Sequence, residues 1–151
     1  MGGAIVRRGV YDAFMRGPER TIELFHGYTY SAHPLACAAA LAALDLYRDE
    51  GLFARARRLE APFAEAAMTL KRLPGVLDVR SVGLAAGIDL APRADAAGAR
   101  GYEAMERAFR DEDLMIRITG DTLAVCPPLI ATEAQIGEIF DKLSRAIRAT
   151  N

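Results

Sequence analysis

The spacing of apolar residues predicts a run of helices that begins near His33. Pro34 suits the first position of a helix, and Gly51 suits the position just after its end. The many alanines between them allow this helix to pack very closely against a neighbour. A second helix follows, and Pro62 inside it predicts a kink or a break near Glu60. Its apolar residues recur at helical spacing: Leu52, Ala56, Leu59, Phe63, Ala67 and Leu70.

Beyond Gly75 the spacing changes to the alternation that is typical of β-strands. Residues 76–82 and 84–90 predict two short strands joined at Gly83, and residues 92–98 predict a loop. A third helix is expected after this loop. Its predicted apolar face carries Tyr102, Met105 and Phe109.

The last part of the chain predicts a hairpin and a final helix. Residues 114–118 and 122–125 alternate around Gly120-Asp121, a pair that favours a β-hairpin turn. Thr132 and Gln135 have the spacing of a capping box. The apolar stripe of the final helix consists of Ile136, Ile139, Phe140, Leu143 and Ile147. This order of elements indicates an α+β fold, with helices packed on one face of a small, mostly antiparallel sheet.

The first 31 residues give weaker signals. Residues 4–6, Ala-Ile-Val, predict a short strand. Residues 10–15 predict a short helix that ends at Gly17-Pro18.

Composition excludes several classes of protein. The chain has 151 residues and a formal net charge of −1, which argues against a nucleic-acid binder. It has no run of about 18 apolar residues that could span a membrane. Cys37 and Cys126 are too few for a disulfide framework. Because the first residues also lack the order of a signal peptide, we expect a cytoplasmic protein.

Hydroxyl groups gather just before the alanine-rich helix. Thr29 and Ser31 precede Pro34 in a segment rich in aromatic residues. The start of a helix carries free N–H groups and a positive partial charge, so it suits an anion such as a phosphate. An ordinary helix cap with a turn explains the same residues, because hydroxyl caps are common.

Arg117 interrupts an apolar strand. Alternation places it on the face of the strand opposite Ile116 and Ile118. An arginine on a rigid strand is a good bidentate anchor for a carboxylate. The alternative is a solvated arginine on the outer face of the sheet.

Other residues that could carry chemistry are less promising. His33 and Cys37 have helical spacing, but no second ligand pair completes a metal site, so we expect no metal. We expect the two lysines, Lys71 and Lys142, to lie on the surface, because neither has the apolar surroundings that activate a lysine.

Four segments resemble the C-terminal part of class III aminotransferases, specifically the omega-amino acid (beta-alanine):pyruvate type. They are residues 17–31, 33–40, 117–122 and 127–130. The resemblance implies a PLP-dependent enzyme of fold type I that moves an amino group from an omega-amino acid to pyruvate.

The resemblance also implies domains and residue roles. Residues 1–50 would close the large cofactor-binding domain, and residues 51–151 would form the small C-terminal domain. Thr29 matches the threonine that reaches the PLP phosphate of the neighbouring subunit of a homodimer or larger homo-oligomer. Tyr28 matches the aromatic residue that lines the partner's substrate pocket. Arg117 matches the arginine that binds the substrate carboxylate.

The chain departs from the family pattern in two ways. The family's Schiff-base lysine, the aromatic residue that stacks on the cofactor and the acid that pairs with its nitrogen all lie upstream of Met1, so we expect this chain to be inactive alone. Ala32 stands where a glycine is expected. The alternative function is a non-catalytic α+β interaction module derived from the small domain.

Overall fold

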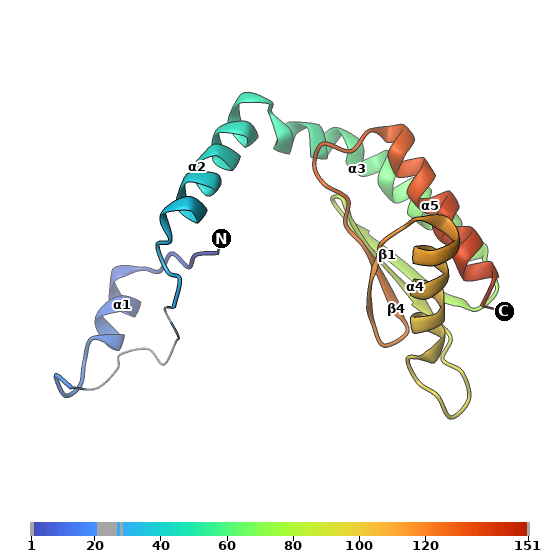
Figure 1. Cartoon of the computed structure of the whole chain (residues 1–151), viewed down its shortest axis with the longest axis horizontal. Helices are drawn as coiled ribbons and strands as arrows, with labels where there is room; N and C mark the ends of the chain where they lie inside the picture. The colour runs from blue at the N-terminus through green and yellow to red at the C-terminus, as the bar shows by residue number, and fades with distance from the viewer. Residues whose placement is uncertain (1, 21–26, 28, 151) are drawn as a thin grey trace. The chain divides into compact units, whose positions relative to one another are not determined.

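The computed structural model describes residues 2–20, 27 and 29–150, which form two units (Figure 1). The first unit is Met1–Asp49 and the second is Glu50–Asn151. The first unit carries helices α1 and α2, and the second carries the remaining helices and all four strands of the described sheet.

The described residues of the first unit form two helices and bury no side chain. Helix α1 spans Arg8–Phe14 and helix α2 spans Pro34–Asp49, and neither contains a buried residue. Pro34 is the first residue of α2, as the sequence predicts. The predicted strand at residues 4–6 is wrong: these residues are exposed and lie outside every helix and strand. A strand needs a partner, and the strands of the described sheet all belong to the second unit.

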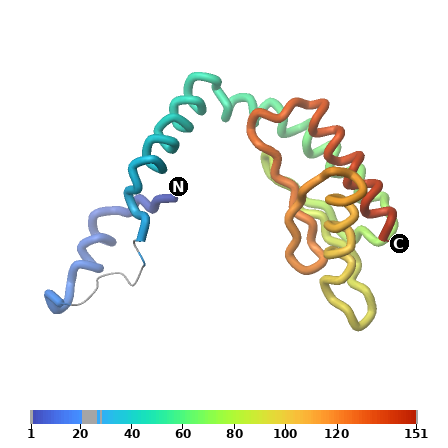
Figure 2. The backbone as a smooth tube through the Cα atoms, viewed as in Figure 1, coloured from blue at the N-terminus to red at the C-terminus, as the bar shows by residue number. Residues whose placement is uncertain are grey.

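The sheet of the second unit is antiparallel throughout. Strands β1 (Val76–Val82) and β2 (Ala85–Leu90) form the predicted pair around Gly83. Strand β4 (Thr122–Val125) pairs with β2 and with β3 (Arg117–Thr119), giving the order β1-β2-β4-β3. The predicted hairpin is therefore present, with a first strand shorter than expected. Figure 2 follows its backbone near the end of the chain.

The core lies between one face of this sheet and the helices. Val79, Ile88 and Leu123 are paired across β1, β2 and β4, and all three are buried. Phe63 of α3 (Leu52–Thr69) meets Phe140 of α5 (Glu133–Arg148) edge to face, with ring centroids 5.1 Å apart. The capping box of α5 is confirmed, and its predicted apolar residues lie in or against the core. The α+β fold class is thereby confirmed.

Helix α3 continues through Pro62 without a break. The sequence predicts a kink or a break near Glu60, and of these the break is wrong. Proline removes one backbone hydrogen bond, but Phe63, which directly follows it, and Ala67, one turn further on, are fully buried and hold the helix against the core. No helix in the described ranges is long and apolar enough to cross a membrane.

Helix α4 (Ala99–Glu112) presents a different face to the core from the predicted one. Tyr102 and Phe109 are 53% and 57% exposed. The residues of α4 that are buried are all small: Gly101, Ala104 and Ala108. The helix lies so close to the hairpin that a large side chain has no room. A Cβ atom at Gly101 would lie 2.3 Å from the carbonyl oxygen of Gly120.

We predict that Gly101→Ala destabilises the chain by about 1–3 kcal/mol, because the added methyl group meets backbone atoms that can move only if the hairpin moves. Gly137→Ala is the matched control within α5, since its added Cβ meets nothing within 4 Å. This control should instead stabilise the chain by about 0.5–1 kcal/mol. Urea denaturation followed by circular dichroism measures both. Equal stabilities of the two variants would show that the close contact is absent.

Candidate functional site

Arg117 begins strand β3 and points away from the core. Its neighbours Ile116 and Ile118 are partly buried, whereas Arg117 is exposed and Met115 is 82% exposed. The alternation predicted for this strand is confirmed. Arg117 is paired with Ala124 of β4, so its side chain stands on the open face of the sheet.

A second arginine stands in the same cross-strand row, and it is already engaged. Arg80 pairs with Gly87, and Gly87 pairs with Ala124, the partner of Arg117. The Arg80 guanidinium forms an ion pair with Asp89 and lies over Gly87, where a Cβ would come within 3.3 Å of it. In contrast, no described carboxylate lies within ion-pair distance of Arg117. Its guanidinium is therefore available to an external carboxylate.

An apolar groove of about 410 Å³ adjoins Arg117. It lies where the pairing of the hairpin strands ends, beyond Arg117 and Ala124. Its lining combines Arg117 with Leu114, Met115, Ile116, Ala124, Val125, Cys126, Pro127, Pro128 and Ile139. The site can accept a molecule with a carboxylate at one end and an apolar body.

Asp121 joins the hairpin turn to the start of α4. Its two carboxylate oxygens accept the backbone N–H groups of Gly98 (2.6 Å) and Gly101 (2.9 Å). Burial raises the pKa of Asp121, but the N–H donors of Gly101, Gly98 and Arg100 and the charge of Arg100 lower it by more, so the pKa lies below its ordinary value. The sequence indicates Asp121 only as a turn residue. No local pattern reveals that it accepts the N–H group of Gly101, 20 residues earlier in the chain.

Asp89 fixes the middle of the sheet's open face. It accepts a hydrogen bond from the hydroxyl of Thr122 at 2.7 Å in addition to its ion pair with Arg80. The hydrogen bond from Arg80, followed by that from Thr122, holds the pKa of the Asp89 carboxyl below its ordinary value. The same pairing raises the pKa of Arg80.

Thr29 lies in the first unit, in an exposed turn that leads into α2. Within this turn Tyr30 and Ala32 adopt φ values of 72° and 57°, the left-handed region that favours glycine. Ala32 thus occupies a conformation that suits the glycine expected from the resemblance. Tyr28 lies outside the described residues.

Neither lysine forms a catalytic cluster with the residues described. Lys71 is half exposed and contacts Asp78 at 3.2 Å. Lys142 contacts Glu138 at 3.0 Å, and its side chain is only 23% exposed, so it is more buried than the sequence indicated. In the described part of the chain, no three His, Cys, Asp or Glu side chains are grouped to hold a metal ion.

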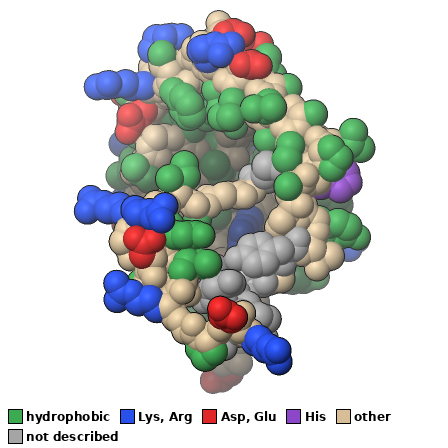
Figure 3. Space-filling model, turned by 90° about the vertical axis from the view of Figure 1, so that its left-hand side faces the viewer, with side chains coloured by type: hydrophobic (Ala, Val, Ile, Leu, Met, Phe, Trp, Pro, Cys, Tyr) green, Lys and Arg blue, Asp and Glu red, His purple; other side chains and the backbone are tan. Residues whose placement is uncertain are grey.

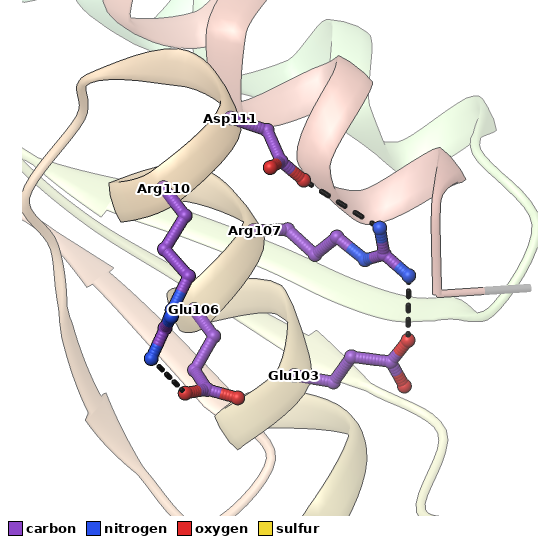
Figure 4. Close-up of a pocket in the computed structure, with 5 residues that line it drawn as sticks. All are labelled: Glu103, Glu106, Arg107, Arg110 and Asp111. Atoms are coloured by element: carbon purple, nitrogen blue, oxygen red, sulfur yellow. Dashed lines mark hydrogen bonds and ion pairs between the residues drawn. The ribbon is translucent and has the colours of Figure 1, made fainter.

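A second cavity, of about 440 Å³, is lined by charged residues of α4, which Figure 4 draws. Arg107 bridges Glu103 and Asp111 at 3.6 and 3.5 Å, and Arg110 contacts Glu106 at 3.3 Å. Both arginines that line this cavity are therefore engaged by carboxylates of the same helix. It has the character of a solvated surface, which leaves the groove at Arg117 as the better candidate site.

Residues 1–147 match the family described as aminotransferase class-III. The chain belongs to the class-III aminotransferase family. Members of this family depend on PLP. The resemblance drawn from the sequence is confirmed, including its omega-amino acid type.

The curated relatives of this chain include two bacterial aminotransferases. The omega-aminotransferase of Caulobacter vibrioides is 50% identical over 146 residues, which cover 96% of this chain and 33% of that protein. The beta-alanine–pyruvate aminotransferase of Pseudomonas aeruginosa is 37% identical over 149 residues, which cover 97% and 33%. The chain spans about a third of the length of the curated relatives it matches.

Solved structures agree with this assignment. An omega transaminase from Pseudomonas jessenii matches with a TM-score of 0.75 and 32% identity over 85% of this chain and 30% of that one. An adenosylmethionine-8-amino-7-oxononanoate aminotransferase from Methanocaldococcus jannaschii matches with a TM-score of 0.76 and 30% identity over 93% and 33%. The α+β structure therefore corresponds to about a third of a fold-type I transaminase.

We predict that the free energy of unfolding falls as the pH drops from about 5 to 2. A carboxyl whose pKa is lower in the folded state stabilises the fold above its unfolded pKa, and this contribution disappears as the pH falls through the folded pKa. Asp89 is such a carboxyl. Asp89→Asn should therefore lower the free energy of unfolding at pH 7 by about 1–2 kcal/mol and make its loss in acid smaller. Urea denaturation at pH 7 and pH 3 measures both effects. Asp141→Asn, which removes an exposed carboxylate from α5, is the control, and an identical pH dependence for the two variants would contradict the prediction.

Proposed function

We propose that this chain forms the C-terminal part of an aminotransferase that moves an amino group from an omega-amino acid, such as beta-alanine, to pyruvate. Family membership supports the reaction class, and the names of the two bacterial relatives support the donor and acceptor. In this proposal, residues 1–50 close the large domain and residues 51–151 are the small C-terminal domain.

The observation that carries the proposal is the guanidinium of Arg117, which has no ion-pair partner among the described residues and lies beside an apolar groove. Beta-alanine and pyruvate both bear a carboxylate, and a guanidinium can donate two parallel N–H bonds to its two oxygens. The groove accommodates the carbon atoms next to the carboxylate and limits contact of the ion pair with water, which strengthens the attraction. Arg117 thus binds and orients the substrate.

Thr29 fits a role in holding the PLP phosphate. It has no hydrogen-bond partner among the described residues, and it stands shortly before the N-terminus of α2, where backbone N–H groups favour an anion. We assign it to the cofactor of a neighbouring subunit and Tyr28 to that subunit's substrate pocket, which makes the enzyme a homodimer or larger homo-oligomer. When bound, PLP supplies the electron sink for transamination.

The exposed surface of the first unit favours the enzyme over the alternative, a non-catalytic interaction module. Leu41 and Leu44 of α2 are 63% and 59% exposed, and hydrophobic side chains are visible at the surface drawn in Figure 3. Such a surface needs a cover, which a large domain and a second subunit supply. The complete core of residues 50–151 is the observation in favour of a module.

We predict that Arg117→Ala, in an enzyme completed with the upstream two-thirds of the Caulobacter vibrioides relative, slows reaction with beta-alanine by about 30- to 1000-fold. This corresponds to the loss of about 2–4 kcal/mol of charge-assisted binding in the transition state. The donor half-reaction of an aromatic amine without a carboxylate should change far less. Single-turnover absorbance of the cofactor measures both donors.

Two variants serve as controls for this measurement. Arg80→Ala removes a guanidinium from the same row that is already paired with Asp89, so it should not discriminate between the donors. Arg117→Lys should restore only part of the rate, because an ammonium group lacks the planar fork. Equal losses with both donors in Arg117→Ala would show that Arg117 has only a structural role.

We predict that the 151-residue chain alone has no transaminase activity. Lys71 and Lys142 are its two lysines, and both contact acidic side chains on the surface of the second unit. The check is borohydride reduction after addition of PLP, followed by peptide mapping and an assay with beta-alanine and pyruvate. Stoichiometric labelling at a single lysine together with turnover would overturn this prediction.

A further inference from the structure

Strand β3, which carries Arg117, is held by a single neighbouring strand and by the packing of Ile116 and Ile118 against the core. It is three residues long and forms an edge of the sheet, so it pairs with β4 alone. The pairing ends at Arg117 and Ala124, and beyond this pair lies the apolar groove. The position of Arg117 therefore depends in part on the other end of the hairpin, the turn at Gly120-Asp121.

That turn is attached to α4 by contacts that allow little movement. Both carboxylate oxygens of Asp121 accept N–H groups from the first turn of α4, at 2.6 Å from Gly98 and 2.9 Å from Gly101. The backbone of Gly120 lies against Gly101 so closely that a Cβ has no room. Helix α4 itself packs on α5, so the turn is connected through α4 to the core of the second unit.

We infer that Asp121 is a positioning residue for substrate binding: it fixes the β3–β4 hairpin against α4 and thereby holds the Arg117 guanidinium where the substrate carboxylate binds. This inference rests on the proposed function of Arg117. A charge-assisted pair of hydrogen bonds from guanidinium to carboxylate tolerates little displacement, because both bonds need near-linear geometry. A hairpin that swings about its open end would lose one or both.

Asp121→Asn is the sharpest test, because it keeps the size of the side chain. A carboxylate has two acceptor oxygens, whereas an amide has one oxygen and an NH₂ group that cannot accept. The variant must therefore leave Gly98 or Gly101 without its acceptor. Asp89→Asn is the matched control, since it removes an aspartate that bonds the same hairpin through Thr122 but leaves the turn attached to α4.

The first measurement uses the 151-residue chain and follows hydrogen exchange by NMR. In Asp121→Asn, the amides of Gly98, Gly101 and the β3–β4 hairpin should exchange about tenfold faster or more, relative to core amides of α5. In Asp89→Asn, the exchange of the Gly98 and Gly101 amides relative to the same core amides of α5 should be as in the wild type. Wild-type exchange at the turn and in the hairpin of Asp121→Asn would overturn the inference, whatever the enzyme assay gives.

The second measurement uses the completed enzyme described for Arg117. Asp121→Asn should raise the KM for beta-alanine about tenfold and leave the KM for an aromatic amine within about twofold of wild type, with kcat for the amine preserved. Asp89→Asn should leave the KM values for both donors unchanged. A uniform loss with both donors would mean that Asp121 only stabilises the fold. If Arg117→Ala does not discriminate between the donors, the proposed function is wrong. If Arg117→Ala is selective but Asp121→Asn has normal KM values, the inference about Asp121 is wrong and the proposed function stands.

Discussion

The contact between the first turn of α4 and the β3–β4 turn is the constraint on which the candidate site depends. Asp121 supplies acceptors for N–H groups that a helix start leaves unpaired, and Gly101 and Gly120 allow the two backbones to meet. Because α4 lies so close, its inner face is built from small residues, and its large apolar residues are turned outward. The other end of the hairpin, at Arg117, takes no part in this contact and borders the groove.

This arrangement explains why one arginine on the sheet is structural and another is available for binding. Arg80 lies on β1, the edge strand on one side of the sheet, where Asp89 and the flat surface over Gly87 of the adjacent strand occupy its guanidinium. Arg117 lies on β3, the opposite edge strand, beyond the reach of Asp89, and borders the groove. Of two arginines in one cross-strand row, one guanidinium is thus engaged and the other is available, because the charges beside them differ.

The sequence predicts an element correctly where burial in the core determines the spacing of its apolar residues. The stripes of α3 and α5 and the strands β1 and β2 were predicted because their apolar residues pack on a continuous core. The inner face of α4 was not predicted. Tyr102 and Phe109 have the spacing of an apolar helix face, but the neighbouring hairpin lies too close to admit them to the core. Residues 4–6 have strand propensity but no strand beside them. The cap by Asp121 joins residues 20 positions apart, so no local motif indicates it.

The candidate site was predictable only in part, for a related physical reason. Alternation correctly placed Arg117 on the open face, but whether an arginine there is paired depends on carboxylates from other strands, which only the fold brings near. Thr29 preceded the predicted start of α2 as expected. Its proposed ligand belongs to a neighbouring subunit, so no pattern within this chain defines the rest of that pocket.

The central claim is that Arg117 recognises the charge of a carboxylate. The most direct measurement is the dissociation constant of propanoate compared with that of propanamide, which has nearly the same shape and no charge, for the completed enzyme. If Arg117 recognises this charge, the wild-type enzyme binds propanoate at least tenfold more tightly and Arg117→Ala removes this preference. An unchanged preference for propanoate in Arg117→Ala would contradict it.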